Sequence, residues 1–282
     1  MPLQPLLAAG EVSGIRVSTR PDAVNSQNVA FLKEMGVATV ELGVQSMADE
    51  VLQLSGRGHG SEEVRKASAC LRDAGLAVGL QLMPGLPGDT PEKALASLHD
   101  ILALKPDFLR IYPTLVIAGT GLAKLYEDGC YRPMTLAGAV DLCKVMLHEA
   151  AAAGVPVIRM GLQPTAELQD AGTIVAGPYH PAFRQLVEGE LCFDLVKKLA
   201  GTLVRSEGPF TIVCSPSRVS DVIGQRKVNM QRIFRQFGIT FAAVKADPEL
   251  CPWEMRITFS GGERTANIIR DLNYPREIIT ND

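Results

Sequence analysis

Residues 78–104 read VGLQLMPGLPGDTPEKALASLHDILAL and hold a complete strand–turn–helix unit. The apolar run 78–83 predicts a strand, and the Pro/Gly-rich stretch 84–88 ends it. Thr90 is predicted to cap the following helix, with Pro91 at the first helical position. The helix is expected to run to about Leu104, so this stretch defines one step of an alternating α/β fold.

The same alternation recurs on both sides of this unit. Strands are predicted to begin near residues 15, 38, 108 and 156, and helices are predicted over 28–35, 61–74 (capped by Ser61) and 135–153. Strand and helix in alternation imply a parallel sheet with its helices outside and right-handed crossovers. A closed eight-stranded barrel needs about 250 residues. The predicted fold class is therefore α/β, with an open sheet or a partial (β/α) barrel.

The pattern changes near residue 205. One more helix is predicted over 180–203, and 205–209 has the composition of a linker. Beyond it, a strand at 210–214, a helix at 226–237 and two strands at 239–244 and 254–259 predict a small α+β appendix. We therefore expect two domains, residues 1–204 and residues 205–282.

Composition limits the classes of protein to which the chain could belong. Its 282 residues are 46% hydrophobic and 21% charged, which is typical of globular proteins. A net charge of −3 argues against a protein that coats nucleic acid by bulk charge. No signal peptide or membrane span is predicted, so we expect a cytoplasmic protein with six reduced cysteines and no membrane association. No two cysteines have the two- to four-residue spacing of zinc or iron–sulfur sites.

Polar residues gather where the predicted strands end, which is where open parallel folds bind ligands. Arg57 and His59 lie nearby in the glycine-rich loop 55–60, and the glycines around His59 argue against a packed core histidine. Hydrogen-bonding side chains and two basic groups at this edge of the sheet suit a zwitterionic or carboxylate-bearing ligand. Arg57 is expected to hold the carboxylate, and the Pro/Gly loop is expected to let a flat ligand approach its backbone. The alternative is that these residues are solvated or cap helices. The candidates at the strand ends are Ser18, Arg20, Gln45, Ser46, Gln81, Met83, Pro84 and Gly85.

Five segments carry a family resemblance. They are STRPD at 18–22, ELGVQS at 41–46, SGRGH at 55–59, LMPGLPGDT at 82–90 and LRIYPTLVIAGTGL at 109–122. In this order and spacing they resemble the radical S-adenosylmethionine (radical SAM) superfamily. The nearest branch is the one that resembles the Elongator catalytic subunit, and oxygen-independent coproporphyrinogen oxidase is a more distant relative. The resemblance covers about residues 14–165 and implies a partial six-stranded (β/α) barrel.

The resemblance also implies a cofactor and roles for site residues. Gln45 would contact the methionine part of S-adenosylmethionine, and Arg57 would pair with its carboxylate. The backbone at 83–85 would lie against the adenine. Ser18 stands where relatives place a ribose-binding carboxylate, and Gln81 where they place an Asp or another polar contact.

The family's [4Fe–4S] cluster motif, C-x3-C-x2-C, does not occur in this sequence. The resemblance therefore predicts an N-terminally truncated or split form, with a separate upstream fragment that carries the motif as a partner. We expect that this chain alone assembles no cluster. The acetyltransferase half of the Elongator subunit is not found either, and the appendix follows instead.

The appendix has a candidate site of its own. Residues 222–227 read VIGQRK and resemble the KH RNA-binding module, in which a GxxG loop between two helices clamps a nucleic-acid backbone. Gly224, Arg226 and Lys227 would form the loop, with Lys227 at the second glycine position. Five basic residues against one acidic residue between 218 and 235 suit phosphates. The alternative is a solvated amphipathic helix.

Three functions follow from these patterns. The first is a truncated or split radical SAM enzyme that modifies RNA or a small molecule. The second is a non-catalytic remnant without a cluster that binds RNA or a protein. The third is an ordinary barrel enzyme that uses Arg57 and His59 for acid–base chemistry.

Overall fold

The computed structural model of the chain describes residues 4–163, 165, 170, 172–204 and 207–274. The chain divides into two compact units. The first comprises Met1–Ala139 with Ala153–Pro181, and the second comprises Val140–Ala152 with Ala182–Asp282. Within the described part, no helix is long and apolar enough to cross a bilayer.

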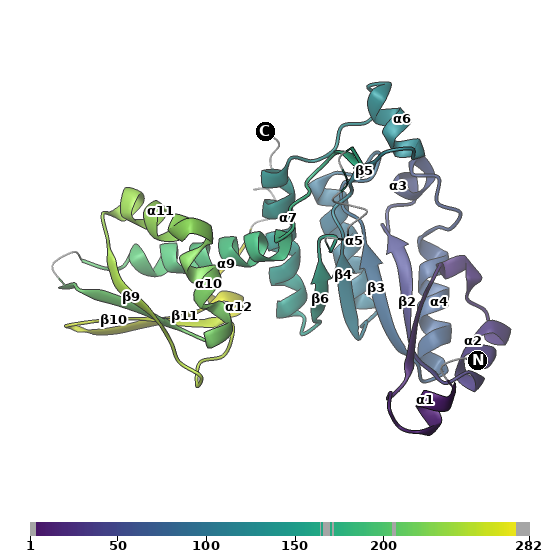
Figure 1. Ribbon diagram of the computed structural model, residues 1–282, viewed down its shortest axis with the longest axis horizontal. Coiled ribbons are helices and arrows are strands. Elements are labelled where there is room, and N and C mark those ends of the chain that lie inside the picture. The colour runs from purple at the N-terminus through teal and green to yellow at the C-terminus, as the bar shows by residue number, and fades with distance from the viewer. Residues whose placement is uncertain (1–3, 164, 166–169, 171, 205–206, 275–282) are drawn as a thin grey trace. The chain divides into compact units, whose positions relative to one another are not determined.

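The first unit is built on a five-stranded sheet with the order β1-β2-β3-β4-β6, in which all neighbouring strands are parallel (Figure 1). This confirms the α/β class and the five strands that the sequence predicts. A short antiparallel pair, β5 with β7, lies outside this sheet and was not predicted. The strands are β1 (Ile15–Thr19), β2 (Val37–Gln45), β3 (Ala77–Leu82), β4 (Phe108–Ile111), β5 (Val116–Ile117), β6 (Val157–Met160) and β7 (Ile174–Ala176).

The helices of this unit begin close to the predicted positions. Thr90 caps α5 as expected, because its hydroxyl accepts a hydrogen bond from the amide of Lys93. The cap of α4 differs: Gly60 takes the N-cap position, and its amide donates to Glu63 Oε2 at 2.9 Å. Ser61 is the first helical residue rather than the cap. The helices are α1 (Gln4–Ala8), α2 (Ser26–Glu34), α3 (Asp49–Leu54), α4 (Ser61–Asp73), α5 (Pro91–Ala103), α6 (Gly121–Glu127) and the start of α7 (Leu136–Ala152).

The two faces of the main sheet differ in chemistry. Successive residues of a strand point to opposite faces. One face, called here the helix-covered face, carries aliphatic side chains that are at most 2% exposed: Val40, Leu42, Val78, Leu80, Leu82, Leu109 and Ile111. The register of the strands places a second set on the other face, called here the polar face: Arg16, Ser18, Thr39, Glu41, Gly79, Gln81, Phe108, Arg110 and Arg159.

The second unit packs helices on a four-stranded sheet with the order β11-β10-β8-β9 (Figure 1). Strand β8 is parallel to β9 and antiparallel to β10. Helix α9 belongs to this unit because Asn229 Nδ2 donates to the carbonyl of Gly189 on α9, at 3.0 Å. The compact units therefore do not coincide with the division expected after residue 204. The elements are α9 (Phe183–Ala200), β8 (Phe210–Cys214), α10 (Val219–Ile223), α11 (Val228–Phe237), β9 (Phe241–Ala246), β10 (Glu254–Phe259), β11 (Gly262–Asn267) and α12 (Ile268–Asp271).

Candidate functional site

An irregularity at the end of β2 turns Gln45 onto the polar face. The register with β3 shifts between Gly43 and Gln45, and Gln45 has a positive φ of 69°. A Cβ atom on Gly43 would lie 2.6 Å from Gln45 Nε2, so the absence of a side chain there makes room for the Gln45 amide. Gln81 Nε2, on the neighbouring strand, donates to Gln45 Oε1 at 3.1 Å. The two predicted glutamines therefore form a hydrogen-bonded amide pair at the carboxyl end of the sheet.

Arg57 joins this pair through Met83. The Met83 amide donates to the Gln45 carbonyl at 2.9 Å, and Arg57 Nη2 lies 3.6 Å from Met83 Sδ. Arg57 is exposed at the rim, yet partial burial lowers the pKa of its guanidinium, and the positive charge of Arg20 lowers it further. The structure thus brings Gln45, Gln81, Met83 and Arg57 into one connected group.

Arg57 has no carboxylate partner within the described part of the chain, although carboxylates stand near it. Asp22 pairs with Arg20 at 2.8 Å, and Asp49 Oδ1 accepts from the Ser61 amide at 2.7 Å. The Glu63 carboxylate already accepts from the Gly60 amide. An anion on a ligand would therefore meet a guanidinium that no described carboxylate neutralises. A hollow of about 440 Å³ beside it is lined by Asp22, Asp49, Gln53, Arg57, Gly58, His59, Gly60 and Glu63.

The backbone after β3 is held in place by its own neighbours. The Gly85 amide donates to Asp89 Oδ2 at 2.8 Å, and Tyr131 Oη donates to the Gly85 carbonyl at 2.6 Å. Gly85 has a φ of 85°, and a Cβ atom on it would lie 2.7 Å from Met134 Cε. Burial raises the pKa of the Asp89 carboxyl to about 6, against the lowering effect of its two backbone hydrogen bonds. The amide and the carbonyl of Gly85 are thus both hydrogen-bonded within the chain. A ring that lies against residues 83–85 would contact this backbone without forming a hydrogen bond to the Gly85 amide.

The other predicted site residues lie outside this group. Ser46 is buried in a turn, where its Oγ accepts from the Ala48 amide at 3.1 Å and lies 3.2 Å from Ser97 Oγ. Ser18 is exposed on the polar face, in register with Glu41. The Pro84 carbonyl accepts from the Thr114 amide at 2.9 Å.

The expectation that His59 is not a packed histidine is wrong. The side chain is buried, and its Nε2 lies 3.2 Å from the Val44 carbonyl. The glycines on either side do not keep His59 outside: they flank a loop that folds back onto β2. A buried imidazole bonded to the backbone does not favour the acid–base enzyme proposed from Arg57 and His59.

The sequence reading missed a charged pair on the polar face. Glu41 Oε2 lies 3.1 Å from Arg110 Nε, and the Glu41 side chain is only 3% exposed. The signal was a charged residue inside each of two otherwise apolar strands, VATVELGVQ and FLRI. Charged residues are rarely buried unless they are paired.

The cysteines do not fit an iron–sulfur cluster. Cys143, Cys192 and Cys214 are buried, and burial raises the pKa of each thiol, that of Cys214 to about 11. Cluster ligands are thiolates, which this environment disfavours. Cys130 and Cys251 are exposed, and within the described residues no group of three His, Cys, Asp or Glu side chains could hold a metal ion.

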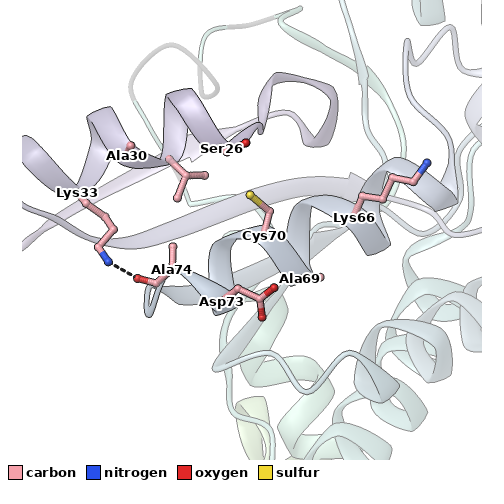
Figure 2. Close-up of a pocket in the computed structure, with 9 residues that line it drawn as sticks. Ser26, Ala30, Lys33, Lys66, Ala69, Cys70, Asp73 and Ala74 are labelled. Atoms are coloured by element: carbon pink, nitrogen blue, oxygen red, sulfur yellow. Dashed lines mark hydrogen bonds between the residues drawn. The ribbon is translucent and has the colours of Figure 1, made fainter.

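A second hollow, of about 600 Å³, lies between α2 and α4 (Figure 2). Ala30 and Cys70 line it from the two helices, and Lys33 closes one end by donating to the Ala74 carbonyl at 2.5 Å. Small side chains on facing helices leave such gaps because they fill little of the space between the backbones. We assign no chemistry to it.

In the second unit, the predicted loop lies between α10 and α11. Arg226 and Lys227 have positive φ values of 51° and 62°, and both side chains are exposed. Two of the five basic residues between 218 and 235 form ion pairs with acidic residues of the same unit. Arg218 pairs with Asp221 at 3.1 Å, and Arg232 pairs with an acidic residue of α9. The basic surface is therefore smaller than the sequence suggested.

Two models of known protein families match most of the first 192 residues. The model described as "Radical SAM superfamily" matches residues 5–101, and the "Radical_SAM C-terminal domain" model matches residues 106–192. Both matches lie in order along the chain and together include the strands β1–β4 and β6.

Curated relatives show the same likeness. The tRNA uridine(34) acetyltransferase of Methanocaldococcus jannaschii is 37% identical over 129 residues, which are 45% of this chain and 24% of that protein. Human Elongator complex protein 3 is 33% identical over 132 residues, which are 46% of this chain and 24% of that protein. The chain thus spans about a quarter of the length of these relatives.

One solved structure is similar over a longer stretch. Elp3 of Methanocaldococcus infernus, with an N-terminal deletion of residues 1–46, superposes with a TM-score of 0.56 at 26% identity. The likeness covers 88% of this chain and 53% of that one.

Proposed function

Because the chain belongs to the radical SAM superfamily, on its Elongator-like branch, we propose that its first unit binds S-adenosylmethionine at the carboxyl end of the polar face. The family uses S-adenosylmethionine together with a [4Fe–4S] cluster. S-adenosylmethionine supplies the radical chemistry for which the superfamily is named. The described cysteines of this chain do not fit such a cluster, so the role assigned to the chain is to bind S-adenosylmethionine.

The observation that carries the proposal is the uncompensated charge of Arg57. Arg57 touches Met83, whose amide bonds to Gln45, and none of the described carboxylates pairs with it. A guanidinium of this kind gains most from a carboxylate, because its fork matches two oxygens. Arg57 would hold the carboxylate of the methionine part of S-adenosylmethionine. The Gln45–Gln81 amide pair would form hydrogen bonds with the other polar groups of that methionine part.

Calorimetric titration with S-adenosylmethionine tests the proposal. We expect Arg57→Ala to weaken binding at least tenfold, since a charge-assisted hydrogen bond contributes about 1.5–3 kcal/mol. Arg65→Ala is the matched control, because Arg65 is an exposed arginine that already pairs with Asp100 at 2.9 Å. Equal affinities in the two variants, or no binding to the unaltered chain, would reject the assignment.

The substrate class proposed for such a domain is RNA. The relatives with the printed name tRNA uridine(34) acetyltransferase support this, although the chain spans only about a quarter of their length. The exposed loop of the second unit supports it independently. Arg226 and Lys227 have no carboxylate partner within the described residues, and Arg235 on α11 is likewise exposed. Phe234 is 56% exposed on the same helix and offers an aromatic surface for base stacking.

RNA binding is tested by fluorescence anisotropy with a labelled 12-nucleotide oligouridylate. The double variant Arg226→Ala/Lys227→Ala should bind more weakly, and the slope of log affinity against log salt should fall, because fewer phosphates are neutralised. Lys245→Ala is the control, since this exposed lysine lies on β9, in register with Val213 on β8, and is not part of the loop. If the double variant and the control bind alike, the loop has no role in RNA binding.

A further inference from the structure

A row of polar side chains crosses the polar face next to the Gln45–Gln81 pair. Gln81 on β3 is in register with Arg110 on β4, and Arg110 is in register with Arg159 on β6. Neighbouring strands lie about 4.8 Å apart, and residues in register share a face. Two arginines therefore stand side by side, next to the glutamine that belongs to the proposed cofactor site.

The described residues of this face supply a single carboxylate for these two arginines. Glu41, on β2, lies against Arg110 Nε at 3.1 Å, while the terminal nitrogens of Arg110 have no hydrogen-bond partner among the described residues. Arg159 is exposed and makes no ion pair within the described part of the chain. One carboxylate balances one guanidinium, so a positive charge remains at this position.

Like charges in register on neighbouring strands destabilise a sheet, and a ligand anion between them removes that cost. Guanidinium groups match phosphate oxygens bidentately, and Arg is the residue most suited to this recognition. We propose that Arg110 and Arg159 bind a phosphate group of the molecule on which the domain acts. This inference rests on the proposed function, because it places the substrate beside the S-adenosylmethionine site.

The first experiment measures the affinity for inorganic phosphate by calorimetric titration. Arg159→Gln should weaken binding at least tenfold, because the exposed guanidinium is removed without disturbing a buried group. Arg65→Gln, an exposed arginine paired with Asp100, should leave the affinity unchanged. Glu41→Gln should strengthen binding several-fold, since it removes the only competing carboxylate described on this face. Equal affinities for phosphate in Arg159→Gln and in the control overturn the proposal. The proposal is also overturned if no binding is detected with phosphate at about 50 mM, a concentration that reveals even very weak binding.

A second titration identifies the source of the phosphate and separates this proposal from the cofactor site. If the phosphate belongs to a nucleotide, uridine 5′-monophosphate should bind more tightly than inorganic phosphate; if it belongs to a polynucleotide, a short oligouridylate should bind more tightly still. Both titrations use the Arg226→Ala/Lys227→Ala background, so that the loop of the second unit does not bind the oligouridylate. In both cases Arg159→Gln abolishes the gain, and a gain that survives the substitution overturns the proposal. Arg57→Ala should lose S-adenosylmethionine and keep phosphate, whereas Arg159→Gln should do the reverse. Failure of one site is thus distinguishable from failure of the other.

Discussion

The two faces of the main sheet come from the same strands and perform different tasks. Leu42 and Leu80 point to the helix-covered face and are fully buried, whereas Glu41 and Gln81, one residue away, point to the polar face. The buried aliphatic side chains of the helix-covered face stabilise the fold through the hydrophobic effect. The polar face carries charges and amides that contribute little to that core. A period of two along each strand therefore separates stability from ligand binding, and substitutions on the two faces should affect different properties.

The largest effect on stability is expected on the helix-covered face. Leu42→Ala should lower the free energy of unfolding by about 2–5 kcal/mol, because it removes buried surface and leaves a cavity. Urea unfolding followed by circular dichroism measures it. Ser18→Ala, at an exposed position on the polar face, should change stability by about 0.5 kcal/mol or less. Similar losses in both variants would contradict the division between the faces.

A smaller loss in the free energy of unfolding is expected at a packed position of the polar face. A Cβ atom on Gly79 would lie 2.1 Å from Phe108 Cζ, so the tip of this ring occupies the space beside Gly79. Gly79→Ala should cost about 1–3 kcal/mol by forcing this ring aside. Phe108→Leu in the same background should recover part of the loss in thermal unfolding. If Gly79→Ala is as stable as the unaltered chain, Phe108 does not pack in this way.

The third effect depends on pH and concerns Asp89, in the loop that follows β3. Burial raises the pKa of Asp89 in the folded protein from 3.8 to about 6. The folded chain then keeps a proton that the unfolded chain releases, so this contribution to stability is complete below about pH 4 and is lost as the pH rises through 6. The free energy of unfolding should fall by on the order of 1 kcal/mol per pH unit between these values.

Comparison with Asp89→Asn isolates this contribution, because the variant does not titrate at this position. The difference in stability between the unaltered chain and the variant should change between pH 4 and pH 6 and be constant above pH 7. A difference that is constant over the whole range would show that the carboxyl keeps its ordinary pKa.

Local patterns predicted most of the fold. Pro91 after Thr90, and aliphatic runs separated by glycines, located the main strands and helices because these signals act within a few residues. β11 was missed because GERTAN carries the polar composition of an exposed edge strand rather than an apolar run. Its pairing with β10 forms it, and such a contact is not local.

The site was predicted less completely for a related reason. Strand ends indicated Gln45 and Gln81, the glycine-rich loop indicated Arg57, and the structure joins these residues. The row of Gln81, Arg110 and Arg159 depends on the register between strands far apart in the sequence. Likewise, the sequence shows that Arg218 and Arg232 are basic, but not that α9 and Asp221 supply their partners. Long-range pairing decides which charges remain available to a ligand.

Methyl NMR of the methionine side chains tests the central claim most directly, because the chain carries a suitable reporter on each face. Met83 contacts Arg57 at the carboxyl end of the polar face, and Met160 is buried at 4% exposure, in register with Ile111 of the helix-covered face. Addition of S-adenosylmethionine should shift the Met83 methyl resonance, leave Met160 unchanged and have no effect on Met83 in the Arg57→Ala variant. A shift of Met160 without Met83, or a Met83 shift that persists in Arg57→Ala, would contradict the account.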